Sequence, residues 1–257
     1  MRFLIKCPTK AAQLSAMFTQ LKAFADIIVL RPSNNGILLQ CMDSSKICLL
    51  DSLLSNTWFD EYSCEDGGNI AELGLAPRVM GMVLSTWKEG QSIEVSTQGP
   101  DAINVTLESS GDAHLNKYFR VQLIEVESEL LDLSEKGESQ VDLTLPTKRM
   151  VELVTQLSMF DSVLRVDFGD ETVVLESMGD DGALRVEVAL EDVTEYALTE
   201  PLQQQFSLSY LQTICGFGKL CSELAMKFSP DRPMEAQYVL GDDSHVTLYL
   251  APKIDSD

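Results

Sequence analysis

The chain has 257 residues, of which 45% are hydrophobic and 23% charged, the proportions of a globular protein. Forty acids against 19 Lys and Arg give a formal net charge of −21, which disfavours nucleic-acid binding over the whole surface. No apolar run approaches the roughly 18 residues of a membrane-spanning helix, and the first residues lack the apolar core of a signal peptide. The six cysteines show no CxxC spacing. We therefore expect an intracellular protein with reduced thiols and no membrane partner.

Helical and alternating patterns predict a strand, a helix and a hairpin at the start of the chain. After a strand at 3–7, the helix is expected at 8–24, because apolar residues recur there at the i, i+3, i+4, i+7 spacing of one helical face. These residues are Leu14, Met17, Phe18 and Leu21. Pro8 stands near the helix start, where proline is tolerated. Asn35-Gly36 then separates apolar runs at 27–30 and 37–40, which indicates a hairpin.

The same order of elements recurs before the middle of the chain. A strand at 73–75 leads into a second, shorter helix from Pro77 to about Trp87, with Val79, Met82 and Val83 on one side. Further strands are predicted at 47–50, near Ser63, at 92–96 and at 103–107, and the stretch 118–126 alternates like a strand.

The middle of the chain is acidic. Between Val121 and Gln140 it has six carboxylates and one base, Lys136, and strand-like patterns flank it on both sides. A polar, self-repelling stretch between two patterned halves is typical of a linker. It nevertheless contains Leu130, Leu131 and Leu133, which a simple spacer does not need.

The two halves repeat each other. Three segments occur twice: Pro-Thr-Lys at 8–10 and 146–148, Thr-Gln-Leu at 19–21 and 155–157, and a four-residue segment that begins with Leu and ends with Met at 39–42 and 175–178. One two-residue gap keeps the register, so we predict a duplicated domain. The domains are 1–121 and 141–257, joined by a connector at 122–140. Each has two helices packed on one side of antiparallel sheets, an α+β fold.

The second copy repeats the element pattern as well. Its first helix contains Met150, Leu153, Val154 and Leu157 at the spacing of one face, and its second contains Leu208, Leu211 and Ile214. The strands expected after the second helix are 225–228, 236–240 and 246–250.

Seven of the 19 bases fall on or beside the four predicted helices. They are Lys10, Lys22, Arg78, Lys88, Lys148, Arg149 and Lys219. For any single one, an ordinary solvated helix face is the simpler interpretation. Together, in a chain with so many acids, they favour a helical side that faces a polyanion and holds it without reading sequence.

Catalytic motifs are absent from the sequence. The only histidines are His114 and His245, and no HExxH, GxSxG or cysteine metal spacing occurs. The run 216–219 lacks the glycine spacing of a phosphate loop. Asp180-Asp181-Gly182 and Gly241-Asp242-Asp243 are predicted as hairpin turns rather than metal sites. We expect no enzyme, no metal and no cofactor.

Two motifs resemble one family. Met42-Asp-Ser-Ser45 after the first hairpin and the tail Tyr249-Leu-Ala-Pro-Lys-Ile254, with the duplication and the acidic connector, are similar to the PCNA (proliferating cell nuclear antigen) sliding clamps. The resemblance implies a homotrimeric ring with helices lining the hole around double-stranded DNA. It also implies DNA polymerase, a clamp loader and repair proteins as partners, and a nuclear location, or a viral replication site if a virus encodes the chain.

The resemblance also implies the site residues. A groove for partner peptides would be formed by Met42, Lys46, Ile47, Leu49, Leu131, Leu133, Pro233, Tyr249, Ala251 and Pro252. For Met42 and Ile47 the alternative is a place in the core. The seven helix bases would face DNA. The subunit contact would use Lys117, Phe119 and Val121 from one chain, and Leu184 and Val186 from the next.

The chain departs from the family pattern in places. Ser15 and Ala16 stand where lysines are frequent, the hairpin at 168–170 lacks a modifiable lysine, and Ser134 stands where a proline is common. Two alternatives remain: a subunit of a heteromeric checkpoint-type clamp, and an acidic adaptor that binds proteins but no DNA.

Overall fold

The computed structural model describes residues 1–64, 72–97, 99, 101–109, 111, 115–126, 129–133 and 137–253. His114, Ser134, Lys136 and Ile254 lie outside the described residues. The chain forms two compact units. Unit 1 comprises Met1–Ser44, Leu50–Leu130 and Leu240–Val246; unit 2 comprises Ser45–Leu49, Leu131–Val239 and the chain from Thr247 onward.

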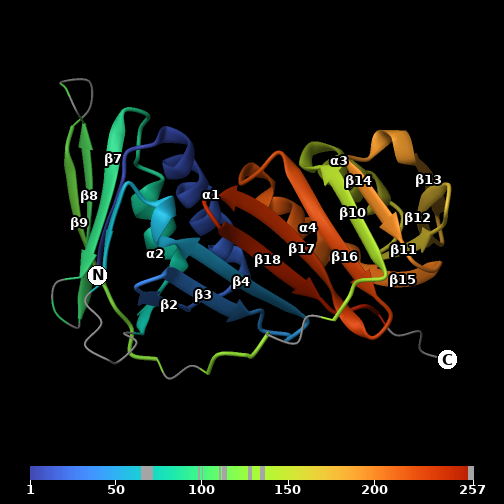
Figure 1. The fold of residues 1–257 in the computed structure, drawn as a ribbon, viewed down its shortest axis with the longest axis horizontal. Coiled ribbons are helices and arrows are strands. Elements are labelled where there is room, and N and C mark those ends of the chain that lie inside the picture. Colours follow the sequence, from blue (N-terminus) through green and yellow to red (C-terminus); the bar gives the residue numbers. More distant parts are fainter. Residues whose placement is uncertain are drawn as a thin grey trace. The chain divides into compact units, whose positions relative to one another are not determined.

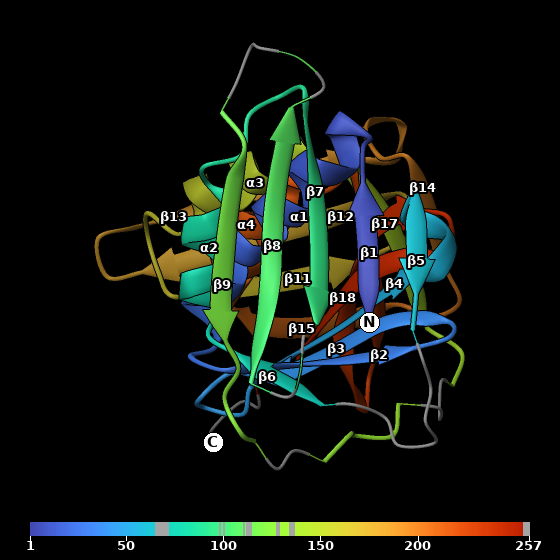
Figure 2. The same cartoon turned by 90° about the vertical axis from the view of Figure 1, so that its left-hand side faces the viewer.

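Unit 1 contains a five-stranded antiparallel sheet, seen face-on in Figure 2. Its order is β5 (Glu61–Ser63), β1 (Arg2–Ile5), β7 (Gln91–Thr97), β8 (Ala102–Ser109) and β9 (Lys117–Gln122). A second group of strands has the order β4 (Cys48–Ser55), β3 (Gly36–Met42), β2 (Ile28–Ser33) and β6 (Leu73–Leu75). Helices α1 (Pro8–Phe24) and α2 (Pro77–Leu84) pack against each other, and α1 contacts β1 and β7. A short 3-10 turn, η1 (Asn56–Trp58), follows β4.

Unit 2 repeats this build. Its four-stranded sheet has the order β13 (Gly182–Ala189), β12 (Thr172–Gly179), β11 (Val163–Phe168) and β15 (Leu202–Ser207). Beside one another in Figure 1 lie β14 (Glu195–Leu198), β10 (Val141–Pro146), β16 (Glu223–Ser229), β17 (Arg232–Gly241) and β18 (Ser244–Leu250). Helices α3 (Thr147–Leu157) and α4 (Leu208–Gly216) pack together, and two 3-10 turns, η2 (Leu190–Asp192) and η3 (Phe217–Lys219), complete the unit.

The α+β prediction is confirmed, with two helices and antiparallel strands in each unit. The helix predicted at 8–24 has these bounds in the structure, and the hairpin at Asn35-Gly36 joins β2 to β3. Both Asp-Gly runs are hairpin turns as predicted: Gly179 pairs with Gly182 around 180–181, and Asp242 and Asp243 have left-handed φ values of 50° and 58°.

Two predicted boundaries are wrong. Helix α2 ends at Leu84 instead of near Trp87, because the hydroxyls of Ser85 and Thr86 donate to the carbonyls of Met82 and Val83 and close the last turn. Strand β9 ends at Gln122 instead of Val126. Its neighbour β8 begins at Ala102, the partner of Gln122, so pairing with β8 ends there, and beyond it only an isolated bridge between Ile124 and Gly74 is present in the described residues.

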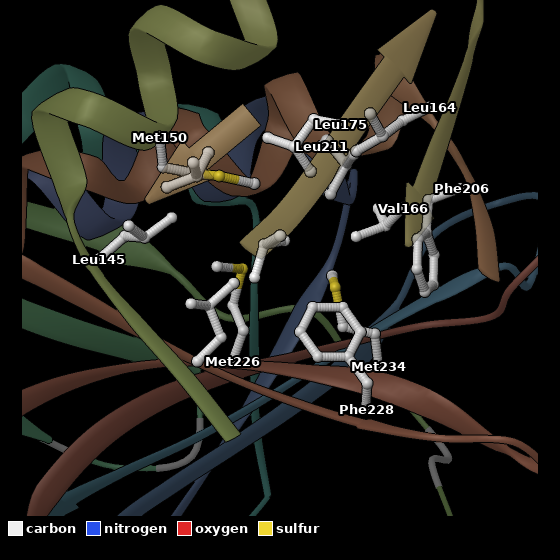
Figure 3. Close-up of a pocket in the computed structure, with 13 residues that line it drawn as sticks. Leu145, Met150, Leu164, Val166, Leu175, Phe206, Leu211, Met226, Phe228 and Met234 are labelled. Carbon is white, nitrogen blue, oxygen red and sulfur yellow. The ribbon is translucent and has the colours of Figure 1, made fainter. Parts of the chain in front are cut away.

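The core of unit 2 lies between its helices and sheets. Phe206 and Phe228 face Met226 and Met234 there, with Met150 of α3 above them (Figure 3). A cavity of about 20 Å³ remains, lined entirely by apolar side chains. A matching cavity of about 20 Å³ lies in unit 1. Both have room for about one water molecule but offer too few polar partners to bind it, so we interpret them as packing defects repeated by the duplication.

Cys215 on α4 provides a test of this packing. Burial raises the pKa of its thiol to about 12, so the thiol stays protonated at pH 8. We expect iodoacetamide to alkylate Cys215 only after unfolding, while the half-buried Cys221 reacts in the folded protein. Peptide mapping by mass spectrometry measures both rates. Equal rates at the two cysteines before unfolding would contradict the buried position.

The same shift predicts a pH dependence of stability. The unfolded chain loses the Cys215 proton near pH 8.5, whereas the folded chain keeps it to about pH 12. The raised pKa of Cys215 therefore contributes fully to the free energy of unfolding below about pH 8.5. This contribution is lost as the pH rises from about 8.5 to about 12. Urea unfolding of the wild type and of Cys215→Ala at pH 7 and pH 10 isolates the effect, which the variant should lack.

Candidate functional site

The predicted DNA-facing bases fall into two groups. Lys10 and Arg149 are already paired with acids: Lys10 Nζ lies 2.7 Å from Asp242 Oδ2, and Arg149 Nη2 lies 3.2 Å from Asp192 Oδ2. Lys10 also lies over the Trp58 ring, 5.8 Å from its centroid. These two cations are thus partly neutralised within their own units.

The other five bases are exposed and form no ion pair within the part of the chain that the structure describes. They are Lys22, Arg78, Lys88, Lys148 and Lys219. Lys22 lies in the last turn of α1, where the helix dipole favours a cation. Lys88 follows α2 instead of lying on it, because that helix ends early. The exposed side of α1 also contains Ala12 and Ala23, so this helix offers few cations.

Part of the predicted groove is assembled in unit 2. The Ala251 N–H donates to the Ile47 carbonyl at 3.2 Å, and the Lys253 N–H donates to the Gln205 carbonyl at 2.7 Å. The first bond places the chain after β18 beside the segment that carries Ile47, and the second places it beside β15. Tyr249 and Pro252 are half-buried there, while Ala251 is exposed.

The remaining residues from the first half differ in burial. Ile47 and Met42 are 41% and 37% exposed, so the alternative that they belong to the core is wrong. Lys46 is exposed and has a left-handed φ of 57°. Leu49, at 8% exposure, is a core residue in the structure and offers a partner little surface. Met42 belongs to unit 1 and the other three to unit 2.

The acidic connector is anchored at its two ends. At the start, the N–H groups of Leu123 and Ile124 donate to the carbonyls of Asp101 and Gly74 at 2.8 and 2.7 Å. At the end, the Gln140 N–H donates to the Phe228 carbonyl at 2.9 Å. Between these anchors Leu131 is 47% exposed and Leu133 is half-buried. Large apolar side chains exposed on a charged segment indicate a surface that contacts another molecule.

One connector contact was missed by the sequence analysis. Arg232, at the start of β17, donates to the carbonyls of Gly137 and Glu138. With the predicted groove residue Pro233 it lines a pocket of about 180 Å³ that also touches Gly137 and Ser139. No periodicity or motif links an arginine to a backbone 95 positions away. Its contact could only be found in the folded chain.

The two strands predicted to join subunits are both at sheet edges. β9 pairs only with β8 in the five-stranded sheet, and β13 only with β12 in the four-stranded one. An edge strand leaves a row of backbone N–H and C=O groups without strand partners, which is a template for pairing with another chain.

Apolar side chains on these edges are incompletely covered. Phe119 lies opposite the fully buried Val105, yet is itself half-buried, as are Leu184 and Val186 on β13. Val121 is only 4% exposed and belongs to the core of unit 1. Lys117 donates from Nζ to the Thr86 carbonyl. Phe119, Leu184 and Val186 therefore have surface that a partner could still cover.

No helix in the described ranges is long and apolar enough to cross a membrane. Among the same residues, no group of three or more His, Cys, Asp or Glu side chains could hold a metal ion.

Two α+β domains of the same build, joined by an acidic connector, define a sliding-clamp fold. The chain belongs to the proliferating cell nuclear antigen family: the family's N-terminal domain model matches residues 8–130 and its C-terminal domain model residues 135–253.

Three relatives illustrate the similarity. The proliferating cell nuclear antigen of Chaetomium thermophilum is 28% identical over 233 residues, covering 88% of each chain. Proliferating cell nuclear antigen 2 of Drosophila melanogaster is 24% identical over 225 residues, covering 86% of each. Proliferating cell nuclear antigen 2 of Plasmodium falciparum is 24% identical over 268 residues, covering 98% of this chain and 99% of that protein.

Proposed function

We propose that this clamp-family chain forms a homotrimeric ring that encircles double-stranded DNA and acts as a polymerase processivity factor. The observation that carries the proposal is the pair of edge strands, β9 and β13, one in each unit. Each has half-buried apolar residues on its core side. Pairing β9 of one chain with β13 of the next is a head-to-tail contact, and such contacts close into a ring when the rotation permits.

DNA would be held by topology and weak phosphate contacts. The five exposed bases, which pair with no acid in the described residues, supply positive charge without base-reading geometry, which suits sliding. With a net charge of −21, the rest of the surface would repel DNA, so the cations must be gathered on the side that faces DNA. The ring would need no catalysis, metal or cofactor of its own.

Partner proteins would bind through short peptides. The exposed Met42, Ile47 and Leu131, with Tyr249, Ala251 and Pro252, offer apolar contacts for an aromatic-anchored segment. The partners are DNA polymerase, a clamp loader and repair proteins that carry PCNA-interacting peptide motifs. The work would take place in the nucleus, or at a viral replication site if a virus encodes the chain.

Solution mass tests the homotrimer. Light scattering of the purified chain at micromolar concentration should give three times the 28.4 kDa of one chain. A monomer under these conditions would refute the homotrimer and favour the alternative, a subunit of a heteromeric clamp.

The cations give a prediction on salt dependence. We expect Lys22→Ala, Lys148→Ala and Lys219→Ala together to weaken binding to a short linear duplex equally for all sequences. Each lost phosphate contact should make the slope of log K against log salt shallower by about 0.9. Fluorescence anisotropy over a salt series measures this. Arg165→Ala, which removes another exposed cation, is the control; an equal change for each charge removed would show that only net charge matters.

A further inference from the structure

Arg232 follows the tight turn at 230–231 that joins β16 to β17. Its Nη1 donates to the Gly137 carbonyl at 2.9 Å, and its Nη2 donates to the Glu138 carbonyl and to Ser229 Oγ, the latter at 2.9 Å. The planar guanidinium thus bridges two successive connector carbonyls. Hydrogen bonds from an ionised donor are stronger than those between neutral groups.

The hydrogen bonds of the guanidinium go to two backbone carbonyls and one hydroxyl, and none of them goes to an acid in the described residues. The chain has 40 acids, yet Arg232 makes no ion pair with any residue that the structure describes. It also lies directly against Gly137: a Cβ added there would meet Nη1 at 3.1 Å and Cζ at 3.2 Å. Both carbonyls lie outside helices and strands, so Arg232 supplies partners that regular structure does not.

Arg232 also determines where the connector's anchored end begins. Gln140 is fixed independently, by its N–H to the Phe228 carbonyl and by its side-chain amide to the Glu200 carbonyl at 3.0 Å. Among residues 137–140, Gln140 is the one whose backbone N–H is bound, and Arg232 adds the carbonyls of Gly137 and Glu138 as further fixed points. Arg232 therefore fixes the connector at a point closer to its leucines than Gln140 does.

Arg232 also lies next to a predicted groove residue. Arg232 and Pro233 line the same pocket of about 180 Å³, whose connector wall is Gly137 and Ser139. Movement of the connector end would change this wall directly.

We propose that Arg232 is a positioning residue, a latch that holds the end of the connector and so sets the place of Leu131 and Leu133 for partner binding. This inference rests on the proposed groove. Arg232 acts through the connector backbone and need not touch the partner peptide itself.

The rate of proteolysis after Glu138 measures how firmly Arg232 holds the connector, and it requires no partner peptide. Glu-C protease must pull the Glu138 carbonyl, an acceptor of Arg232, away from the guanidinium before it can cut. We expect Arg232→Ala to raise the cleavage rate after Glu138 about tenfold or more, because two charge-assisted bonds are lost. Cleavage after the exposed Glu125, at the other end of the connector, should not change and is the internal reference.

Two more variants separate the latch from charge and from folding. Arg232→Lys keeps the charge but lacks the planar fork, so its cleavage rate should be intermediate. It also replaces Arg232→Ala if that variant does not fold. Arg165→Ala removes an exposed arginine elsewhere in unit 2 and should behave as the wild type. An unchanged rate after Glu138 in Arg232→Ala, or in Arg232→Lys where only that variant folds, would overturn the latch.

Binding of a fluorescein-labelled peptide with a PCNA-interacting motif completes the test. Arg232→Ala should weaken its affinity several-fold. Faster cleavage with unchanged affinity would overturn the positioning role. If the wild type binds no such peptide, the proposed groove fails, whereas the cleavage rates still decide whether the latch exists.

Discussion

Replacing Leu184 and Val186 with aspartate should convert the proposed trimeric ring into monomers of 28.4 kDa. Both side chains are half-buried on β13, an edge strand, where the neighbouring chain would complete their cover. Covering the rest of two such side chains contributes about 3 kcal/mol, and that contribution would be lost at every subunit contact. The association constant should then fall by roughly two orders of magnitude.

The introduced carboxylates add to the effect. Each would have to be removed from water at the contact without a base opposite it, which costs more than the lost apolar cover alone. Because Leu184 and Val186 are only partly buried in one chain, the variant should keep its secondary structure by circular dichroism.

A control on the same strand sharpens the test. Arg185 lies on the opposite face of β13 and pairs with Glu187 at 3.1 Å. Arg185→Ala should leave the trimer intact in light scattering. The edge-to-edge contact would be refuted if the aspartate variant remained trimeric, or if Arg185→Ala dissociated equally.

The second large effect concerns the connector. Leu131→Ala with Leu133→Ala should weaken binding of a peptide with a PCNA-interacting motif by about 30-fold or more. An anchor side chain packed against two leucines gains roughly 1.5–3 kcal/mol from burial, and truncating both leucines removes much of it. Isothermal titration calorimetry measures the loss directly.

Leu130 is the matched control for these leucines. At 43% exposure it resembles Leu131, at 47%, but it is not among the predicted groove residues. Leu130→Ala should bind the peptide like the wild type. The double variant should also keep the oligomeric state of the wild type; dissociation would mean that the leucines hold the oligomer together and do not line a peptide groove.

Local patterns were sufficient for most elements. The helix at 8–24 followed from four apolar residues at helical spacing, and its bounds are those of α1. Boundaries that depend on distant partners were predicted less well. The end of β9 is set by where β8 begins, and the end of α2 by two hydroxyls that close its last turn. Neither is visible in hydrophobic periodicity.

The candidate site shows the same limit. The family resemblance suggested Ile47 and Ala251 for the groove, and in the structure a hydrogen bond joins their backbones. The sequence could not show that Leu49 is buried, or that Lys10 is paired with Asp242, because both depend on contacts between distant segments. Arg232 lies beside a predicted groove residue, but its hydrogen bond to the Gly137 carbonyl depends on the folded structure and could not be predicted from the sequence.

Retention on circular DNA tests the central claim most directly. The chain is loaded onto a nicked circular plasmid with a clamp loader and passed through a gel-filtration column in moderate salt, which removes protein held only by charge. An encircling ring should stay with the circle and leave it once a single cut makes the plasmid linear. Protein that stays bound after the cut, or that never stays with the circle, would contradict the account.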